Sequence, residues 1–339
     1  MIGYLKTFMA ILANQKILTL DYWKRADQIQ EGDLVLDRKG QPAKVTLVQK
    51  YTPPHCYEVL FNDHLTIAGD EKLAFIAENR NDRFKENQYK GIRQQTRQYQ
   101  NKQIAHLLEE PLYNPNGQYF FYSVPTTQPI NLPNQDLPIP PFIFGFWFFN
   151  RRSDRQMCPP QGMDDYVLPI FHDHGYIAKP RLKQPNNRRT FTVTPTIESQ
   201  LIPNIPTRIP ANYLMASLEQ RTELLKGILA AKTNQYNIQT KLFRLTTRNA
   251  GVLRQVQWLV ESLGHRTNWF SRNSGRDHRL VFKSLLHLHP NQPLPPKKRI
   301  MARRSIVEVY EIKQQPCVHI ETTGHQGTFL VGEGFISCL

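Results

Sequence analysis

The sequence has few cysteines, few acidic residues and no long hydrophobic run, and each shortage excludes a class of protein. The four cysteines (Cys56, Cys158, Cys317 and Cys338) lie far apart, with neither a Cys-x-x-Cys pair nor a zinc-binding spacing. A reducing compartment such as the cytoplasm therefore fits better than secretion. No run reaches the roughly 18 apolar residues of a membrane span, and Lys6 interrupts the apolar N-terminus. We therefore expect no transmembrane segment and no signal peptide.

Acidic side chains are outnumbered by basic ones. The chain of 339 residues has 43 Lys and Arg against 28 Asp and Glu, which gives a net charge of +15. Such a protein attracts polyanions, because each cation that neutralises a phosphate releases a condensed counterion. The alternative is that the charge only keeps the protein soluble. Because the cations cluster along the sequence, we favour nucleic acid as the partner and expect the protein to be found where that nucleic acid is.

The order of predicted elements divides the chain into β-rich ends and a mixed middle. Residues 10–85 read as short strands separated by Gly, Pro, Asn and Asp, and the pattern returns over residues 293–339. Residues 86–135 are polar and then proline-rich, which predicts a connector with little core of its own. Helical and strand patterns alternate over residues 136–292, and residues 1–9 flank the first strand. The simplest account is an α+β protein in which an all-β module is interrupted by an insert.

Three segments of the insert have helical patterns. Residues 142–150 (FIFGFWFFN) are apolar on all sides, which favours a fully buried helix. Ser217 begins a second helix, with Gln220 as its capping-box partner. The amphipathic stretch NAGVLRQVQWLVESLG predicts a third helix that ends at Gly264.

The first two helices share a spacing. Gly145 precedes the end of its helix at Asn150 by five residues, and Gly227 precedes Lys232 by the same number. A glycine inside a helix is destabilising by about 1 kcal/mol relative to alanine. Two glycines at matched positions therefore predict that the helix backbones approach closely, packed about a pseudo-twofold axis.

These segments resemble LAGLIDADG homing endonucleases. FIFGFWFFN looks like the first LAGLIDADG motif and LLKGILAAKT like the second, and the lead-in over Thr207–Gly227 is similar to intein endonucleases. The resemblance implies two pseudo-symmetric αββαββ units whose strands lie in the DNA major groove. It also implies that an acid at the end of each motif helix holds a divalent metal for phosphodiester hydrolysis, which needs metal-activated water.

The two acid positions of this motif are occupied by Asn150 and Lys232. Asparagine is a poor metal ligand, and an ammonium group repels a cation, so we expect no metal site and loss of DNA cleavage. The alternative is an active endonuclease in which Asp154, Asp164 and Asp165 replace the missing acids, and only then would Mg²⁺ be a cofactor.

Basic residues lie on or beside the predicted strands of the insert. Alternating cations on a strand surface can reach phosphates and guanine edges in a major groove. The alternative is a solvated strand face, but so many like charges would repel each other. The candidate DNA-binding residues are Arg188, Arg189, Lys241, Arg244, Arg248, Arg266, Arg272, Arg276, Arg279 and Lys283.

The flanking β segments resemble the two halves of a Hint (intein) domain. Ile17–Val45 is similar to the opening of such domains, Thr66–Phe75 to the block that carries a Thr-x-x-His element, and Pro316–Ser337 to the closing blocks. The resemblance therefore implies an all-β Hint domain split by the endonuclease insert.

Protein splicing requires a first-position nucleophile, a histidine in the second block and a terminal asparagine. The alignment puts Ala10 at the first position and Lys72, or Glu71 if the register slips by one, at the histidine. Cys338 lies near the final histidine position, and Leu339 cannot cyclise. A few inteins do begin with alanine, but the printed sequence has nothing after Leu339 to ligate. We therefore expect that the chain does not splice.

Three further groups of polar residues have simpler structural readings. His172–His174 lie before Gly175, which favours a turn over a metal site. His287 and His289 are expected at the surface, and Cys317 with His319 in a packed strand rather than in a catalytic pair.

The sequence thus predicts a degenerate intein and homing-endonuclease-like protein that still binds double-stranded DNA. We expect a monomer with no small-molecule substrate. Besides the active endonuclease, a third possibility is a scaffold that binds RNA or another acidic partner.

Overall fold

The computed structural model describes residues 9–80, 100–150, 156–180, 190–197, 200, 206–232, 235–272, 276–284, 286–293 and 303–339; for Arg272 it describes the backbone alone. The chain forms two compact units, which are described separately. One unit comprises Met1–Asn131 and Ile300–Leu339, and the other comprises Leu132–Arg299. The first unit is thus assembled from both ends of the chain, with the second inserted between them in sequence.

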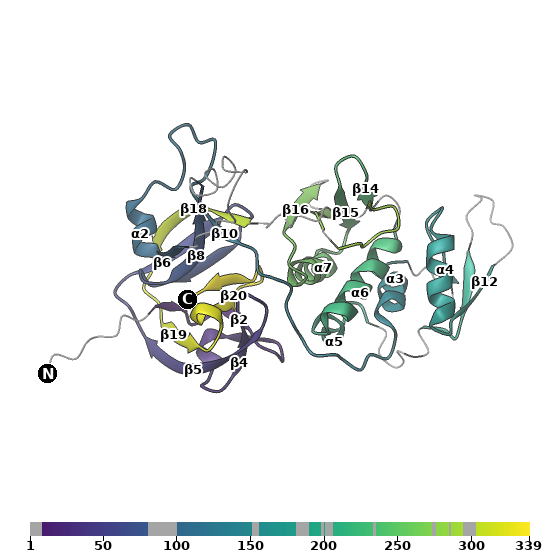
Figure 1. Ribbon diagram of the computed structural model, residues 1–339, viewed down its shortest axis with the longest axis horizontal. Helices are drawn as coiled ribbons and strands as arrows, with labels where there is room; N and C mark the ends of the chain where they lie inside the picture. The colour runs from purple at the N-terminus through teal and green to yellow at the C-terminus, as the bar shows by residue number, and fades with distance from the viewer. Residues whose placement is uncertain are drawn as a thin grey trace, which may run out of the picture. The chain divides into compact units, whose positions relative to one another are not determined.

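The first unit, here called the β unit, is built from antiparallel strands (Figure 1). Its strands are β1 (Ala10–Leu12), β2 (Lys16–Leu18), β3 (Trp23–Arg25), β4 (Leu34–Leu36), β5 (Pro42–Tyr51), β6 (Cys56–Phe61), β7 (Thr66–Gly69), β8 (Ala74–Asn79), β9 (Gln100–Gln103), β10 (Tyr122–Pro125), β18 (Arg303–Ile312), β19 (Cys317–Thr322), β20 (Phe329–Val331) and β21 (Ile336–Cys338). They pair in the order β3-β2-β20-β21-β8-β10-β18-β6-β7-β1-β19-β5-β4, with β9 added to β8. A bridge between Thr19, which follows β2, and Val35 of β4 joins the two ends of this order.

The core of the β unit mixes residues from both ends of the sequence. Ile11 and Ile17 from the N-terminal segment pack in one cluster with Ile306, Val318 and Phe329 from the C-terminal segment. Alternation of polar and apolar residues along the strands directs these side chains inward. The N-terminal and C-terminal segments therefore bury their apolar residues against each other.

Part of the segment that we predicted to be a connector belongs to the β unit. Residues 100–131 supply β9, β10 and the helix α2 (Ile104–Glu109), and they place Ile104, Leu107 and Tyr122 in the core. The structure differs from the expectation because a few apolar side chains in a polar segment are enough to anchor it on an existing core. Residues 81–99, which include the start of this segment, lie outside the described residues.

The second unit, here called the helical unit, contains helices and two small sheets (Figure 1). Its helices are α3 (Pro141–Asn150), α4 (Asp164–Asp173), α5 (Ala211–Leu214), α6 (Leu218–Ala230) and α7 (Ala250–Ser262). Its strands are β11 (Gln156–Met157), β12 (Ile177–Pro180), β13 (Phe191–Thr194), β14 (Tyr236–Asn237), β15 (Leu242–Thr247), β16 (Thr267–Arg272) and β17 (Asp277–Phe282). The strand orders are β11-β13-β12 and β14-β15-β17-β16. Within the described residues, no helix is long and apolar enough to cross a membrane.

The three predicted helices are confirmed. Phe142 to Trp147 of α3 are buried, as expected for a helix that is apolar on all sides. Ser217 and Gln220 form the capping box of α6. The last helix, α7, is followed by Gly264 with a φ of 81°, a conformation that favours glycine and ends the helix.

The two matched glycines lie where α3 and α6 cross. A Cβ on Gly145 would lie 2.4 Å from the carbonyl oxygen of Leu224, and a Cβ on Gly227 would lie 2.1 Å from that of Phe142. Each glycine therefore faces the residue three positions before the other glycine. This reciprocal contact is that of a pseudo-twofold axis, and only glycine lets the two backbones come so close.

In the described residues, the two halves of the helical unit differ in their number of strands. The second half has the order α6-β14-β15-α7-β16-β17, which is the expected αββαββ. Among the described residues, the first half has a single strand, β11, between α3 and α4, so it is αβαββ there. After β11 the chain enters Pro159 and Pro160, which lack the N–H groups that a further strand would need.

Candidate functional site

The C-terminal ends of α3 and α6 meet through the side chain of Asn150. Its Nδ2 donates to the carbonyl oxygens of Ala231 and Cys158, at 2.9 Å in both cases. Its Oδ1 accepts from the backbone N–H of Cys158 at 2.8 Å. Both polar ends of this amide are thus engaged by the backbone, and one of its bonds joins the two helix ends.

The residues at these helix ends do not fit the divalent cation that the LAGLIDADG resemblance implies. The amide of Asn150 is committed to the backbone, and exposed Lys232 brings a positive charge to the neighbouring helix end. Asp164 and Asp165 lie in the first turn of α4, where acids favour the helix dipole. The described residues contain no group of three or more His, Cys, Asp or Glu that could hold a metal, and Asp154 is not among them.

One face of the four-stranded sheet carries two of the candidate DNA-binding arginines. Residues opposite each other on adjacent strands point to the same face. Arg279 is paired with Thr246 and Phe270, and Arg244 occupies the same face two residues from Thr246. Phe270 is 50% exposed, so this face, here called the outer face, presents both cationic and aromatic side chains.

The opposite face of this sheet is closed by packing. Phe243, Leu245, Leu280 and Phe282 are buried there, and α7 packs against the sheet. Strand alternation therefore fixes which side chains can meet a ligand: the arginines face away from the core because their neighbours in sequence face into it.

The other candidate basic residues do not all lie on the outer face. Arg248 is 91% exposed and lies 3.6 Å from the carboxylate of Asp277, while Arg266 is half-buried. Arg272 stands opposite Asp277 in the strand register. Lys241, Arg276 and Lys283 are exposed at the ends of strands, and Arg188 and Arg189 lie outside the described residues.

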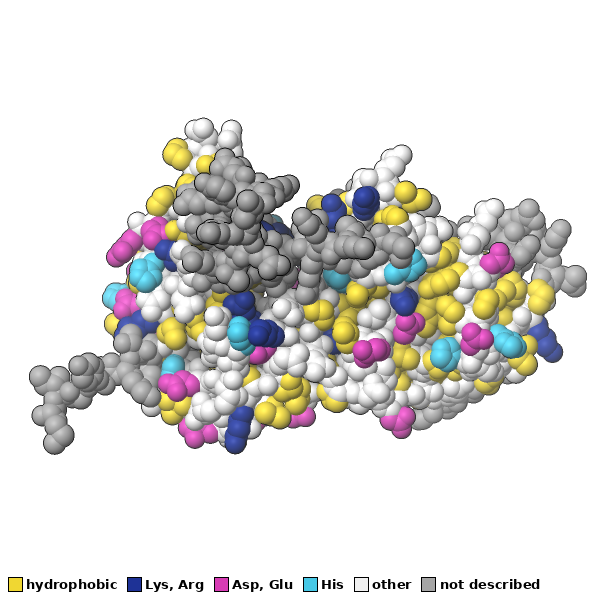
Figure 2. All heavy atoms as spheres, viewed as in Figure 1, with side chains coloured by type: hydrophobic (Ala, Val, Ile, Leu, Met, Phe, Trp, Pro, Cys, Tyr) yellow, Lys and Arg dark blue, Asp and Glu magenta, His cyan; other side chains and the backbone are white. Residues whose placement is uncertain are grey.

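On the face shown in Figure 2, hydrophobic, acidic and histidine side chains are interspersed over the helices of the helical unit. Its described Lys and Arg side chains do not form a continuous patch there. On this face the helices are therefore poor candidates for binding a polyanion.

The β unit holds Ala10, the first-position residue of the Hint resemblance, through Asp70. The backbone N–H of Ala10 donates to Asp70 Oδ1 at 3.1 Å, and the carbonyl oxygen of Ala10 accepts from the N–H of Asp70 at 3.0 Å. Asp70 also accepts from the N–H groups of Lys72 and Leu73 and, at 2.5 Å, from the hydroxyl of Tyr51. Burial raises the pKa of Asp70, although these hydrogen bonds act in the opposite direction.

His319 contacts the peptide bond before Ala10. Its Nδ1 lies 2.7 Å from the carbonyl oxygen of Met9, so the tautomer protonated at Nδ1 donates to that oxygen. The sequence assigned His319 only to a packed strand and missed this contact and the role of Asp70. Only the strand register, which pairs Ala10 with His319, indicates that this histidine lies beside the first strand.

The other predicted splicing positions lie around the same segment. Lys72 is half-buried. Gly69, three residues before it, has no room for a side chain, because a Cβ there would lie 2.2 Å from the carbonyl oxygen of Ala10. Cys338 is buried in β21, and the N–H of Leu339 donates to the carbonyl oxygen of Ala74 at 3.1 Å. Ala10 and Leu339 thus attach to the two ends of the Asp70–Ala74 segment, and neither brings a reactive side chain to it.

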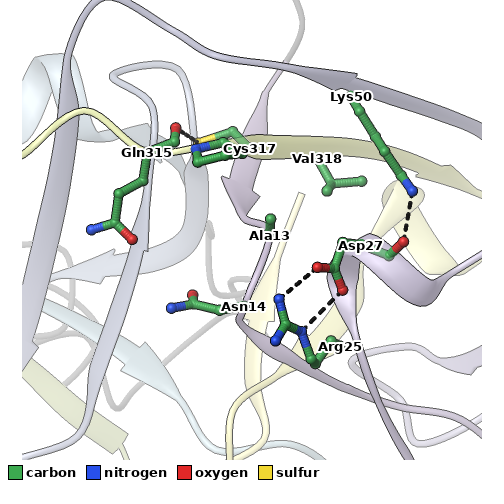
Figure 3. Close-up of a pocket in the computed structure, with 9 residues that line it drawn as sticks. Ala13, Asn14, Arg25, Asp27, Lys50, Gln315, Cys317 and Val318 are labelled. Atoms are coloured by element: carbon green, nitrogen blue, oxygen red, sulfur yellow. Dashed lines mark hydrogen bonds and ion pairs between the residues drawn. The ribbon is translucent and has the colours of Figure 1, made fainter.

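Cys317 lines a pocket of about 310 Å³ in the β unit (Figure 3). The opposite wall carries Arg25 paired with Asp27, and Lys50 Nζ donates to the carbonyl oxygen of Asp27 at 2.7 Å. Burial, followed by the neighbouring Cys56, raises the pKa of the Cys317 thiol. The thiol is therefore protonated at neutral pH, which is the state of a packed cysteine and not of an activated nucleophile.

Two further histidines singled out in the sequence, His172 and His289, differ in their exposure. His172 and Asp173 are highly exposed at the end of α4, just before Gly175, which agrees with the predicted turn. The expectation of an exposed His289 is wrong: it is buried and stacks on Tyr236, because the segment after β17 folds back onto the sheet.

Removal of the Asp70 carboxylate should loosen the first strand. We expect Asp70→Ala to lower the free energy of unfolding of the β unit by about 3 kcal/mol, because four donors lose their acceptor, two in buried and two in partly buried hydrogen bonds. Asp70→Asn retains an acceptor for the three N–H groups and should lower it by about 1 kcal/mol or less. Chemical denaturation measures both values. Equal losses in the two variants would show that these hydrogen bonds do not hold Ala10.

Comparison with known proteins finds one relative by sequence and several solved structures with similar parts. No protein-family model matches the chain. The replicative DNA helicase DnaB of Mycobacterium intracellulare is 24% identical over 255 residues, which cover 72% of this chain and 40% of that protein. The gp41-1 intein is 20% identical with a TM-score of 0.23, covering 34% of this chain and 74% of that chain. I-DmoI in complex with DNA and Ca is 13% identical with a TM-score of 0.33, covering 47% of this chain and 94% of that chain.

The chain has mixed α and β structure, and it is similar to inteins and to a LAGLIDADG homing endonuclease. These are the two kinds of protein that the sequence motifs resemble. Because the chain spans less than half of the DnaB relative, the activity of that whole protein is not transferred to it.

Proposed function

We propose that this protein binds double-stranded DNA through the outer face of the β14-β15-β17-β16 sheet and neither cuts the DNA nor splices. In this proposal residues 10–85 and 293–339 are the halves of a Hint domain, and residues 136–292 are the endonuclease-like insert. The observation that carries the proposal is the presence of Arg244 and Arg279 on a face whose opposite side is sealed by the core.

The chemistry of the outer face suits duplex DNA. Guanidinium groups contact phosphates and read guanine edges in the major groove, which is wide enough to admit a β-ribbon. Ser, Thr and Asn side chains add hydrogen bonds to phosphates or bases, and Thr246 and Asn268 are exposed on this face. The charge of +15 adds attraction at long range that does not depend on sequence.

Loss of cleavage follows from the chemistry of Asn150 and Lys232. An amide bound to the backbone and an ammonium group cannot supply the carboxylates that hold Mg²⁺ for phosphodiester hydrolysis. In this proposal splicing is lost because Ala10, whose methyl group is no nucleophile, stands at the first position and Lys72 stands where the resemblance expects a histidine. The alternative active endonuclease would have to use acids away from the two helix ends.

A gel-shift selection on a pool of random duplex DNA tests the proposal. It should be run at two salt concentrations, with and without Mg²⁺, and with single-stranded DNA and RNA as competitors. We expect enrichment of one long duplex site with no cleaved product. Cleavage in Mg²⁺ would overturn the loss of activity, and the variants Asp154→Ala, Asp164→Ala and Asp165→Ala would then identify the acids. Weak binding that ignores sequence and strandedness would favour the scaffold alternative.

A further inference from the structure

We infer that the side-chain amide of Asn150 takes the place of a metal ion between the ends of α3 and α6 and clamps the two helices without any divalent cation. The inference rests on the proposed equivalence of α3 and α6 with the LAGLIDADG helices. It concerns stability and not DNA binding, so the two can fail separately.

The ends of α3 and α6 are both electrostatically negative. The last carbonyl groups of a helix lack partners within the helix, and its C-terminus carries a partial negative charge. The ends of α3 and α6 meet closely enough for Asn150 on one to bond Ala231 on the other at 2.9 Å. Two negative ends at this distance require a positive group between them.

The side-chain amide of Asn150 can bond the carbonyl oxygens at both sides of this junction. Asparagine has two N–H donors on Nδ2, and here each of them has a carbonyl acceptor at 2.9 Å, one on Ala231 and one on Cys158. Oδ1 is held by the N–H of Cys158 at 2.8 Å, which fixes the orientation of the amide. The NH₂ group therefore donates to the same carbonyl oxygens that could otherwise bind a cation.

Lys232, which directly follows Ala231, adds a positive charge at the end of α6. A cation at a helix C-terminus is favourable, and it also raises the energy of any divalent ion placed beside it. Asn150 and Lys232 thus act together: the amide bonds the carbonyls, and the ammonium group supplies the compensating charge.

The decisive variant is Asn150→Asp, which is nearly the same shape but has no donor. Its carboxylate would face two carbonyl oxygens, so in EDTA we expect the midpoint of thermal unfolding to fall by about 5–10 °C. The matched control is Asn249→Asp, because Asn249 caps α7 only by accepting from the N–H of Val252 at 3.1 Å. An aspartate accepts equally well there, so that midpoint should move by about 2 °C or less.

Addition of millimolar Mg²⁺ or Ca²⁺ completes the test. In Asn150→Asp a carboxylate oxygen and the carbonyl oxygens of Ala231 and Cys158 converge, and oxygen atoms are the ligands that these ions prefer. We therefore expect the ion to reverse at least half of the fall in the unfolding midpoint, and to reverse more of it when Lys232→Asp is added. The wild type and Asn150→Ala should show no response to either ion. A variant Asn150→Asp that folds only with the ion present also supports the clamp.

Three results would overturn the inference. One is an Asn150→Asp protein as stable in EDTA as Asn249→Asp, since the amide donors would then be unimportant. Another is a wild-type midpoint that rises with Mg²⁺ and loses the rise in Asn150→Ala, since Asn150 would then be a metal ligand. The last is an Asn150→Asp protein that is destabilised in EDTA and unaffected by both ions, since the amide would then not stand where a cation can lie.

Discussion

Gly227→Ala should destabilise the helical unit by about 3 kcal/mol or more, although alanine is normally the better helix former by about 1 kcal/mol. The added Cβ would lie 2.1 Å from the carbonyl oxygen of Phe142 and 2.9 Å from the backbone nitrogen of Phe146. These are backbone atoms of α3 and cannot rotate away, so the two helices must separate. Hydrogen exchange measured by mass spectrometry should show lost protection in α3 and α6.

Gly251→Ala is the control for this effect. Gly251 lies in α7, where the nearest atom to an added Cβ is Asn249 Oδ1 at 3.3 Å, so there is nearly room for a methyl group. We expect this variant to change the free energy of unfolding by about 1 kcal/mol or less, because helix propensity favours alanine and the contact with Asn249 Oδ1 opposes it. A Gly227→Ala protein as stable as the Gly251→Ala protein would show that α3 and α6 do not cross in backbone contact.

Removal of both outer-face arginines should lower the affinity for the selected duplex about 100-fold. Arg244→Ala and Arg279→Ala each remove one cation from the sheet face, and a lost phosphate or base contact weakens binding by about 1–3 kcal/mol. Two lost phosphate contacts should also reduce the slope of log affinity against log salt by about 2. Fluorescence anisotropy over a range of salt concentrations measures both quantities.

The control removes the same charge from the β unit. Lys16 pairs with Glu333 at 3.0 Å and Arg25 with Asp27 at 2.6 Å, so Lys16→Ala with Arg25→Ala lowers the net charge equally and leaves the outer face intact. We expect this pair to reduce affinity by less than about threefold, through long-range attraction alone. Equal losses from both double variants would mean that net charge, and not the outer face, binds the DNA.

Local sequence patterns predicted most individual elements. The capping box at Ser217, the apolar run of α3 and the period of α7 act within a few residues, so they can be read without the fold. The glycine spacing also predicted the close helix approach, since a glycine in a buried helix needs a packing reason.

The misses have a common cause. The segment 100–131 looked like a connector, and His289 looked exposed, because their own composition is polar. In the structure a few of their side chains pack on surfaces made by distant segments.

The sequence by itself determined the residues that we expect at the chemical positions: Asn150 and Lys232 at the ends of the two LAGLIDADG-like helices, and Ala10 at the first position of the Hint resemblance. It also determined the basic charge, because composition does not depend on folding. Only the tertiary structure decided what those residues touch. The contact of Asn150 with Ala231, of Asp70 with Ala10 and of His319 with Met9 each join residues at least 60 positions apart. Such contacts depend on strand register and helix crossing, which the packing of the whole chain sets and no local pattern contains.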